Sequence, residues 1–101
     1  MRWVAIAIGS SLVVACSLGR PAEDATGEEI YSLLCSRCHG DDLEGGVGQA
    51  LGPGSDAADE GDGYFRFTIV NGRGRMPSFS STLTDDQVDR LIGFLREAQG
   101  R

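Results

Sequence analysis

The sequence predicts a small, mainly helical domain that folds around a bound group rather than around a large core of its own. Two segments carry helix-start signals followed by apolar residues at helical spacing, and a Cys-x-x-Cys-His motif ends the first of them. The chain has 101 residues. About 85 remain after a predicted leader, and so short a chain seldom buries enough apolar surface without a disulfide, metal or cofactor.

Residues 1–15 are predicted to be a secretory signal peptide. Arg2 is their only charged residue. The apolar run of about a dozen residues that follows suits a signal and is too short to span a bilayer. Residues 13–16 (VVAC) resemble the bacterial lipobox, in which the cysteine is lipidated before cleavage. This resemblance implies a lipid anchor at Cys16, a tether over residues 16–26 and a location facing the periplasm or cell exterior. The alternative is ordinary cleavage beside an incidental cysteine.

The charge of the chain restricts its partners. All nine basic residues are arginines, against 15 acidic residues, and the net charge is −6. Loss of Arg2 with the leader would bring the mature chain to about −7. This balance argues against nucleic acid and against a basic patch for anionic lipid. It also predicts that any charged docking face for a protein partner is acidic.

Two helices are predicted from capping boxes. Thr26 and Glu29 begin the first helix, whose C-terminal end carries Cys35 to His39. Thr84 and Gln87 begin the last helix, expected over residues 85–98. Its apolar positions recur at i, i+3, i+4 and i+7, namely Val88, Leu91, Ile92 and Leu95.

The middle of the chain is less regular. Residues 40–63 are rich in glycine and acidic side chains and show no periodicity, which predicts a long functional loop. In residues 64–70 (YFRFTIV) apolar and polar residues alternate, a pattern that favours a strand. Possible caps at Asp62 and at Asn71-Gly72 permit a short helix instead.

The motif at residues 35–39 (CSRCH) permits three kinds of chemistry. A structural zinc site needs four ligands, and the mature chain offers no second cysteine pair. A redox disulfide is expected at a helix N-terminus in an α/β pattern, whereas this pair ends a helix. Covalent haem attachment uses both thiols, Cys35 and Cys38, with His39 as an axial iron ligand. Haem is the favoured hypothesis, and zinc and a redox pair are the alternatives.

Met76 is the candidate for a second axial ligand. His39 is the only histidine in the chain, so a second histidine ligand is impossible. The chain has two methionines, and Met1 would be lost with the leader. Met76 lies in a glycine-rich loop before the last helix, between an arginine and a proline. A methionine that fills a gap in the core is the alternative.

At this point the chain resembles the class I c-type cytochromes, the small monohaem electron carriers of bacteria. The resemblance covers residues 27 to about 97. The matching positions are Gly27, Tyr31, Cys35, Cys38, His39 and Gly40; Gly52-Pro53; Gly72, Arg73, Gly74, Met76, Pro77 and Phe79; and Leu91, Ile92, Phe94 and Leu95.

The resemblance implies an all-α cytochrome c fold over residues 27–99, with crossing terminal helices, a short middle helix and long loops around one covalent haem c. It favours helix over strand for residues 63–71. It also implies that the Pro53 carbonyl accepts a hydrogen bond from the axial histidine, which would orient the ring.

The implied function is one-electron transfer between redox proteins, and the anchor at Cys16 implies that these partners are membrane-associated. Iron ligated by both His39 and Met76 has no open position, so no small-molecule substrate and no enzymatic activity are expected. The alternative is a dedicated haem subunit of a membrane-associated dehydrogenase or reductase complex. A peroxidase is a third class, which would need a distal acid or base.

Overall fold

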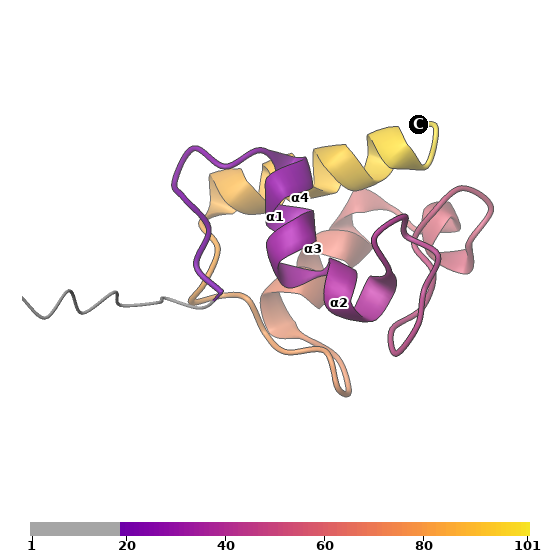
Figure 1. Cartoon of the computed structure of the whole chain (residues 1–101), viewed down its shortest axis with the longest axis horizontal. Coiled ribbons are helices and arrows are strands. Elements are labelled where there is room, and N and C mark those ends of the chain that lie inside the picture. The colour runs from indigo at the N-terminus through magenta and orange to yellow at the C-terminus, as the bar shows by residue number, and fades with distance from the viewer. Residues whose placement is uncertain (1–18) are drawn as a thin grey trace, which may run out of the picture.

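The computed structural model describes residues 19–101 and is shown in Figure 1. Its elements are α1 (Gly27–Leu34), α2 (Ser36–His39), the 3₁₀ helix η1 (Asp56–Asp59), α3 (Asp62–Asn71) and α4 (Asp85–Ala98). Residues 19–101 contain no strand, so the all-α fold expected from the sequence is confirmed. The predicted leader and Cys16 lie outside the described residues. None of the helices in this part of the chain is long and apolar enough to cross a membrane.

Both capping boxes form as the sequence predicts. The amide of Glu29 donates to the Thr26 hydroxyl at 3.1 Å, and that of Gln87 donates to the Thr84 hydroxyl at 3.2 Å. In each case the N3 side chain also accepts from the amide of the capping threonine, which satisfies two helix-end donors at once. The bounds of α4 coincide with the expected residues 85–98.

Residues 62–71 form a helix, so the strand that their alternation favours is wrong. A strand would place Phe65, Phe67 and Ile69 on one face. Instead Phe65 and Ile69, four residues apart, are buried, whereas Phe67 is 68% exposed. Burial at i and i+4 with exposure at i+2 is the pattern of one helical face packed on a core. Packing of α3 against α4 therefore decides its conformation.

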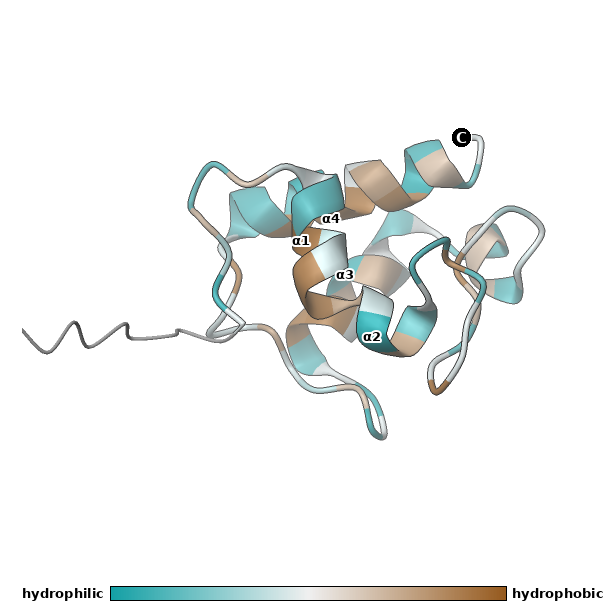
Figure 2. Cartoon of the chain, in the orientation of Figure 1, coloured by the Kyte–Doolittle hydropathy of each residue, from teal (hydrophilic) through white to brown (hydrophobic). Residues whose placement is uncertain are grey.

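The core lies where α1 crosses α4 (Figure 1). Hydrophobic residues concentrate on these helices, while the connecting loops are mostly hydrophilic or neutral (Figure 2). Ile30 and Tyr31 of α1 are buried against Val88 and Leu91 of α4. The ring centroid of Tyr31 lies 5.4 Å from that of Phe94, and such an aromatic pair adds to the burial energy.

Gly27 permits the close approach of the two helices. A Cβ at this position would lie 2.1 Å from the carbonyl oxygen of Arg90 and 2.8 Å from Cβ of Phe94. The absence of a side chain therefore sets how closely α1 packs on α4.

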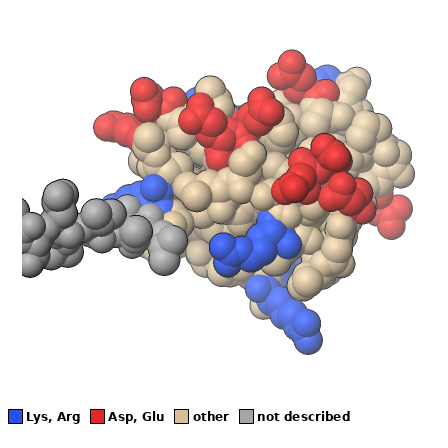
Figure 3. All heavy atoms as spheres, in the orientation of Figure 1, with Lys and Arg blue, Asp and Glu red and all other residues tan. Residues whose placement is uncertain are grey.

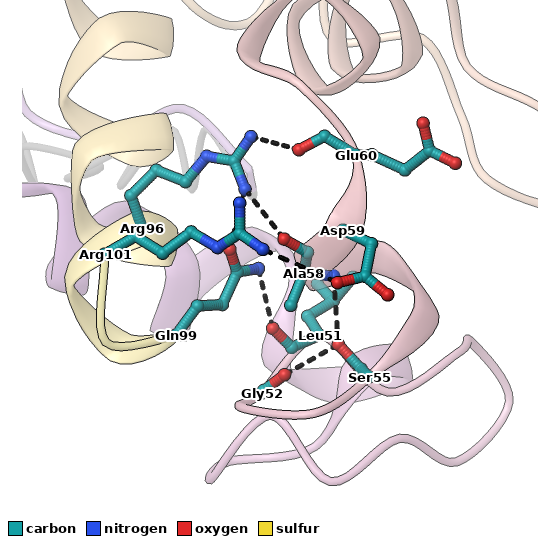
Figure 4. A network of polar contacts seen from close by, with 9 residues as sticks. All are labelled: Leu51, Gly52, Ser55, Ala58, Asp59, Glu60, Arg96, Gln99 and Arg101. Atoms are coloured by element: carbon teal, nitrogen blue, oxygen red, sulfur yellow. Dashed lines mark hydrogen bonds and ion pairs between the residues drawn. The ribbon is translucent and has the colours of Figure 1, made fainter.

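The C-terminal end of α4 holds the loop over residues 51–60 (Figure 4). Arg96 donates to the carbonyls of Ala58 and Glu60, and its Nε lies 2.7 Å from a carboxylate oxygen of Asp62. Its guanidinium also lies 4.5 Å from the centre of the Phe65 ring. Because the Arg96 side chain is only 14% exposed, these contacts are better shielded than an ordinary surface ion pair.

Gln99, just after α4, also binds this loop through a buried hydrogen bond. Its side chain is buried and donates to the Leu51 carbonyl at 2.8 Å (Figure 4). Arg101 adds an exposed ion pair with Asp59 at 3.5 Å. The long loop is therefore ordered by α4 rather than by regular structure of its own.

The segment before α1 packs on the start of α4. Gln87 and Arg90 donate to the carbonyls of Ala22 and Glu23, at 3.1 and 2.7 Å. Arg20 donates to the Ser81 carbonyl at 3.2 Å. Although the sequence predicts a tether over residues 16–26, residues 20–25 are thus attached to the domain.

We expect Gly27→Ala to destabilise the fold by about 1–3 kcal/mol, because its Cβ would collide with backbone atoms of α4. Gly93→Ala is the matched control, since it lies in α4 with nothing within 4 Å of its Cβ position. That control should stabilise the protein by about 0.5–1 kcal/mol through helix propensity. Urea unfolding of both variants measures the difference, and equal stabilities would contradict the close-approach argument.

Candidate functional site

A mostly apolar cavity opens between α1, α2, α3 and the loop before α4. Its main part has a volume of about 210 Å³, and an inner part of about 50 Å³ adjoins it. Six residues line both parts: Cys35, His39, Gln49, Tyr64, Thr68 and Met76. Cys38 lines the outer part only. Four of the five predicted site residues in the described range thus surround one cavity, and Pro53 is the exception.

The cysteine pair sits on a continuous helical path. Cys35 lies between α1 and α2, but the helical hydrogen bonds continue through it. Its amide donates to the Tyr31 carbonyl at 2.8 Å, and its carbonyl accepts from the His39 amide at 2.9 Å. Cys35 is half-buried and Cys38 is exposed. Burial, together with the neighbouring Cys38, raises the pKa of the Cys35 thiol to about 12. A redox nucleophile needs a lowered thiol pKa, so Cys35 does not suit that role.

The orientation of His39 is set by a hydrogen bond to the Gln49 carbonyl. Nδ1 lies 2.7 Å from that oxygen. A carbonyl can only accept, so Nδ1 carries the proton and Nε2 keeps the lone pair that binds metal. An N–H bond of this kind fixes the ring and raises its basicity as a ligand.

The expectation that Pro53 supplies this carbonyl is wrong. The chain after the motif folds back on it, because Gly45 donates to the His39 carbonyl and Gly48 to the Cys38 carbonyl, at 2.7 and 2.8 Å. This turn brings Gln49 beside the imidazole. Pro53 is exposed and lines neither part of the cavity.

Gly48 and Gln49 are functional positions that the sequence reasoning missed. A Cβ on Gly48 would lie 2.8 Å from Cε1 and 2.9 Å from Nδ1 of His39, so only glycine lets the backbone lie against the ring. Gln49 acts through its main chain, which no side-chain pattern reveals. The density of glycines after the motif was the one available signal.

Met76 is presented by a tight turn. Arg73 and Met76 form an isolated antiparallel bridge, with mutual hydrogen bonds of 3.0 and 2.9 Å. Gly72 has a φ of +75°, and a Cβ there would lie 2.6 Å from the Met76 carbonyl oxygen. The turn therefore requires glycine at residue 72 and directs Met76 to the cavity that His39 also lines.

The donor set fits a flat, iron-centred group. Two cysteines in the cavity lining, one imidazole with a free Nε2 lone pair, one thioether and a mostly apolar lining are the ligands and surroundings of a covalently attached haem. The fold and this site together define a class I c-type cytochrome domain.

The chain belongs to the family described as "Cytochrome C oxidase, cbb3-type, subunit III", whose pattern matches residues 22–95. Domains of this family bind haem c covalently and transfer electrons, and the small size of this domain fits one haem.

Several known proteins are similar to it. Dihydro-heme d1 dehydrogenase of Pseudomonas aeruginosa is 32% identical over 103 residues, which cover all of this chain and 20% of that protein. A solved structure of a dihydro-heme d1 dehydrogenase, NirN in complex with DHE, superposes with a TM-score of 0.67 and 34% identity over 76% of this chain and 17% of that one. The chain therefore spans about a fifth of the curated relative.

A second solved structure, the c-type cytochrome NirC, has a TM-score of 0.61 and 30% identity. The match covers 70% of this chain and 85% of that one. The domain is therefore similar both to most of a c-type cytochrome and to one portion of a larger dehydrogenase.

Tyr31 of α1 forms a hydrogen bond with Gly40, the residue after the motif. The raised pKa of its hydroxyl should make the free energy of unfolding depend on pH. Its hydroxyl donates to the Gly40 carbonyl at 2.6 Å, and burial, with nearby anionic groups, raises its pKa from 10.0 to about 12. Between these values the unfolded chain loses a proton that the folded protein keeps, so stability should fall as pH rises from about 10 to 12.

We expect Tyr31→Phe to flatten this alkaline decline and to cost about 1 kcal/mol at neutral pH. Tyr64→Phe serves as a control that keeps the decline. Urea unfolding of the haem-loaded protein across this pH range provides the measurement. Identical alkaline slopes for Tyr31→Phe and the wild type would refute the assignment.

Proposed function

We propose that the domain is a one-electron carrier whose haem is attached through Cys35 and Cys38 and ligated by His39 and Met76. The observation that carries this proposal is that His39, Met76 and both cysteines line one cavity. When bound, the haem supplies the ferric/ferrous couple, and the chain provides the surroundings that tune it.

Each residue then has a definite task. Gln49 holds the imidazole of His39 in the tautomer that ligates through Nε2. Met76 would supply the second protein ligand to the iron and would thereby exclude substrate from the metal, and a methionine ligand raises the reduction potential. The apolar lining, which includes Leu34 and Phe79, keeps water away from the cofactor. These features suit electron transfer in which no covalent bond of a substrate is made or broken.

We further propose that the protein is exported and anchored through lipid on Cys16. Stable anchoring takes two or more acyl chains, which a lipidated N-terminal cysteine of the lipobox type supplies. Its partners would then be redox proteins at the same membrane surface, on the periplasmic or outer side.

A dedicated haem subunit of a dehydrogenase complex is the second candidate. It is supported by the similarity to part of a protein named as a dehydrogenase, of which this chain spans about a fifth. The free carrier is supported by similarity to NirC, a c-type cytochrome that is covered over 85% of its length. We favour the carrier because the match to NirC covers most of that cytochrome, whereas the match to the dehydrogenase covers about a fifth of it.

We expect Met76→Ala to open the sixth coordination position. The variant should bind carbon monoxide in the ferrous state, lose the weak far-red sulfur-to-iron band of the ferric protein and have a lower reduction potential. Pro53→Ala is the control and should change none of these, since Pro53 lines neither part of the cavity. Ready carbon monoxide binding by the wild type, without the far-red band, would favour an enzyme instead.

For the anchor, Cys16→Ala should abolish incorporation of labelled palmitate and release the protein from the membrane fraction, because no acyl chain would remain. Cys38→Ser is the control and should keep the label while losing one thioether. Unchanged labelling in Cys16→Ala would overturn the lipid assignment.

A further inference from the structure

The charge around the cavity differs from that of the protein as a whole. Residues 19–101 contain eight arginines and 15 carboxylates, yet the cavity lining includes Arg73 and Arg75 and no carboxylate. Arg37 is exposed on α2, between the two cysteines. Figure 3 shows arginine side chains over α2 and over the loop that follows α3, while acidic side chains occupy the upper and right parts of the face.

Most other arginines are engaged within the fold. Three form ion pairs and two donate to backbone carbonyls: Arg66 with Asp89, Arg96 with Asp62, Arg101 with Asp59, Arg20 with Ser81 and Arg90 with Glu23. By contrast, the Arg37 and Arg75 side chains make no hydrogen bond or ion pair with residues 19–101. Their charge is available to another molecule.

Arg73 has a different environment. Its Nη1 donates to the Tyr64 hydroxyl at 3.1 Å, and both residues line the cavity. Cross-strand partners in an antiparallel bridge project to the same side, so Arg73 shares the side of Met76. We therefore assign Arg73 to the cavity itself and leave it out of the surface described next.

Apolar groups lie beside the two available arginines. Val47 is 75% exposed and lines the cavity, as does the exposed Pro77. Apolar side chains combined with arginine and without carboxylates are typical of the centre of a protein interface. Arginine also pairs with carboxylates in a planar, two-bond geometry that lysine lacks.

We propose that Arg37, Val47, Arg75 and Pro77 form a docking rim for the acidic face of a redox protein. The inference rests on the proposed electron-carrier function and names the chemistry of its partner. It reverses the acidic docking face expected from net charge, because the cavity lining holds arginines and no carboxylate, although Asp41, Asp42 and Glu44 are exposed in the loop before Val47. Repulsion from the acidic remainder would orient an acidic partner toward this rim.

Two small redox probes of opposite charge test whether the docking rim is positively charged. Ferricyanide takes one electron from the ferrous haem-loaded protein and becomes ferrocyanide, with no bond made or broken. Its rate should fall about threefold or more as ionic strength rises from roughly 10 to 200 mM, because salt screens attraction to the rim. The rate with the cation tris(phenanthroline)cobalt(III) should rise over the same range.

Two double variants distinguish the effect of the rim arginines on the rate from the effect of net charge. R37Q/R75Q should lose the decline with ferricyanide, whereas R66Q/R101Q, with the same change in net charge, should keep it. Polyglutamate, as a macromolecular acidic probe, should slow the wild type and R66Q/R101Q but not R37Q/R75Q.

A ferricyanide rate that rises with salt in the wild type would overturn the inference, as would equal behaviour of the two double variants. Either result in a haem-loaded protein leaves the electron-carrier proposal intact. That proposal fails separately, if a pyridine haemochrome assay of the exported protein shows no covalent haem.

Discussion

The contact between α1 and α4 is the constraint on which the rest of the structure depends. Its closeness rests on Gly27, and its burial rests on Ile30, Tyr31 and Leu91. Because the cysteine pair directly continues α1, this contact also sets the place of the thiols and of His39. The far end of α4 then holds the loop over residues 51–60 through Arg96 and Gln99, so one helix positions both the motif and this loop.

Much of the fold could be predicted from local signals. The capping threonines Thr26 and Thr84 mark both terminal helices within a residue, since cap chemistry depends only on neighbours in sequence. The middle helix could not be predicted from its own residues, because alternation around Phe67 favours a strand. Only tertiary packing, which buries Phe65 and Ile69 together, decides between the two.

The site shows the same division. Cys35, Cys38, His39 and Met76 could be named as candidates from the sequence because side chains of these types bind haem, and the structure gathers them at one cavity. The partner of His39 was not, because a main-chain carbonyl leaves no mark in the residue type. Which carbonyl reaches Nδ1 depends on how Gly45 and Gly48 fold back, so the expected Pro53 is replaced by Gln49. Net charge, for a similar reason, does not predict where the arginines lie.

The attachment of residues 20–25 to α4 bears on how far the domain can travel. Few residues separate Cys16 from Arg20, and an extended chain covers about 3.5 Å per residue. With an acyl anchor at Cys16, the short segment between Cys16 and Arg20 would hold the domain within about 15 Å of the bilayer surface. Such a protein would search for partners by lateral diffusion in two dimensions. It would act as a relay beside membrane-bound enzymes rather than as a shuttle across the compartment.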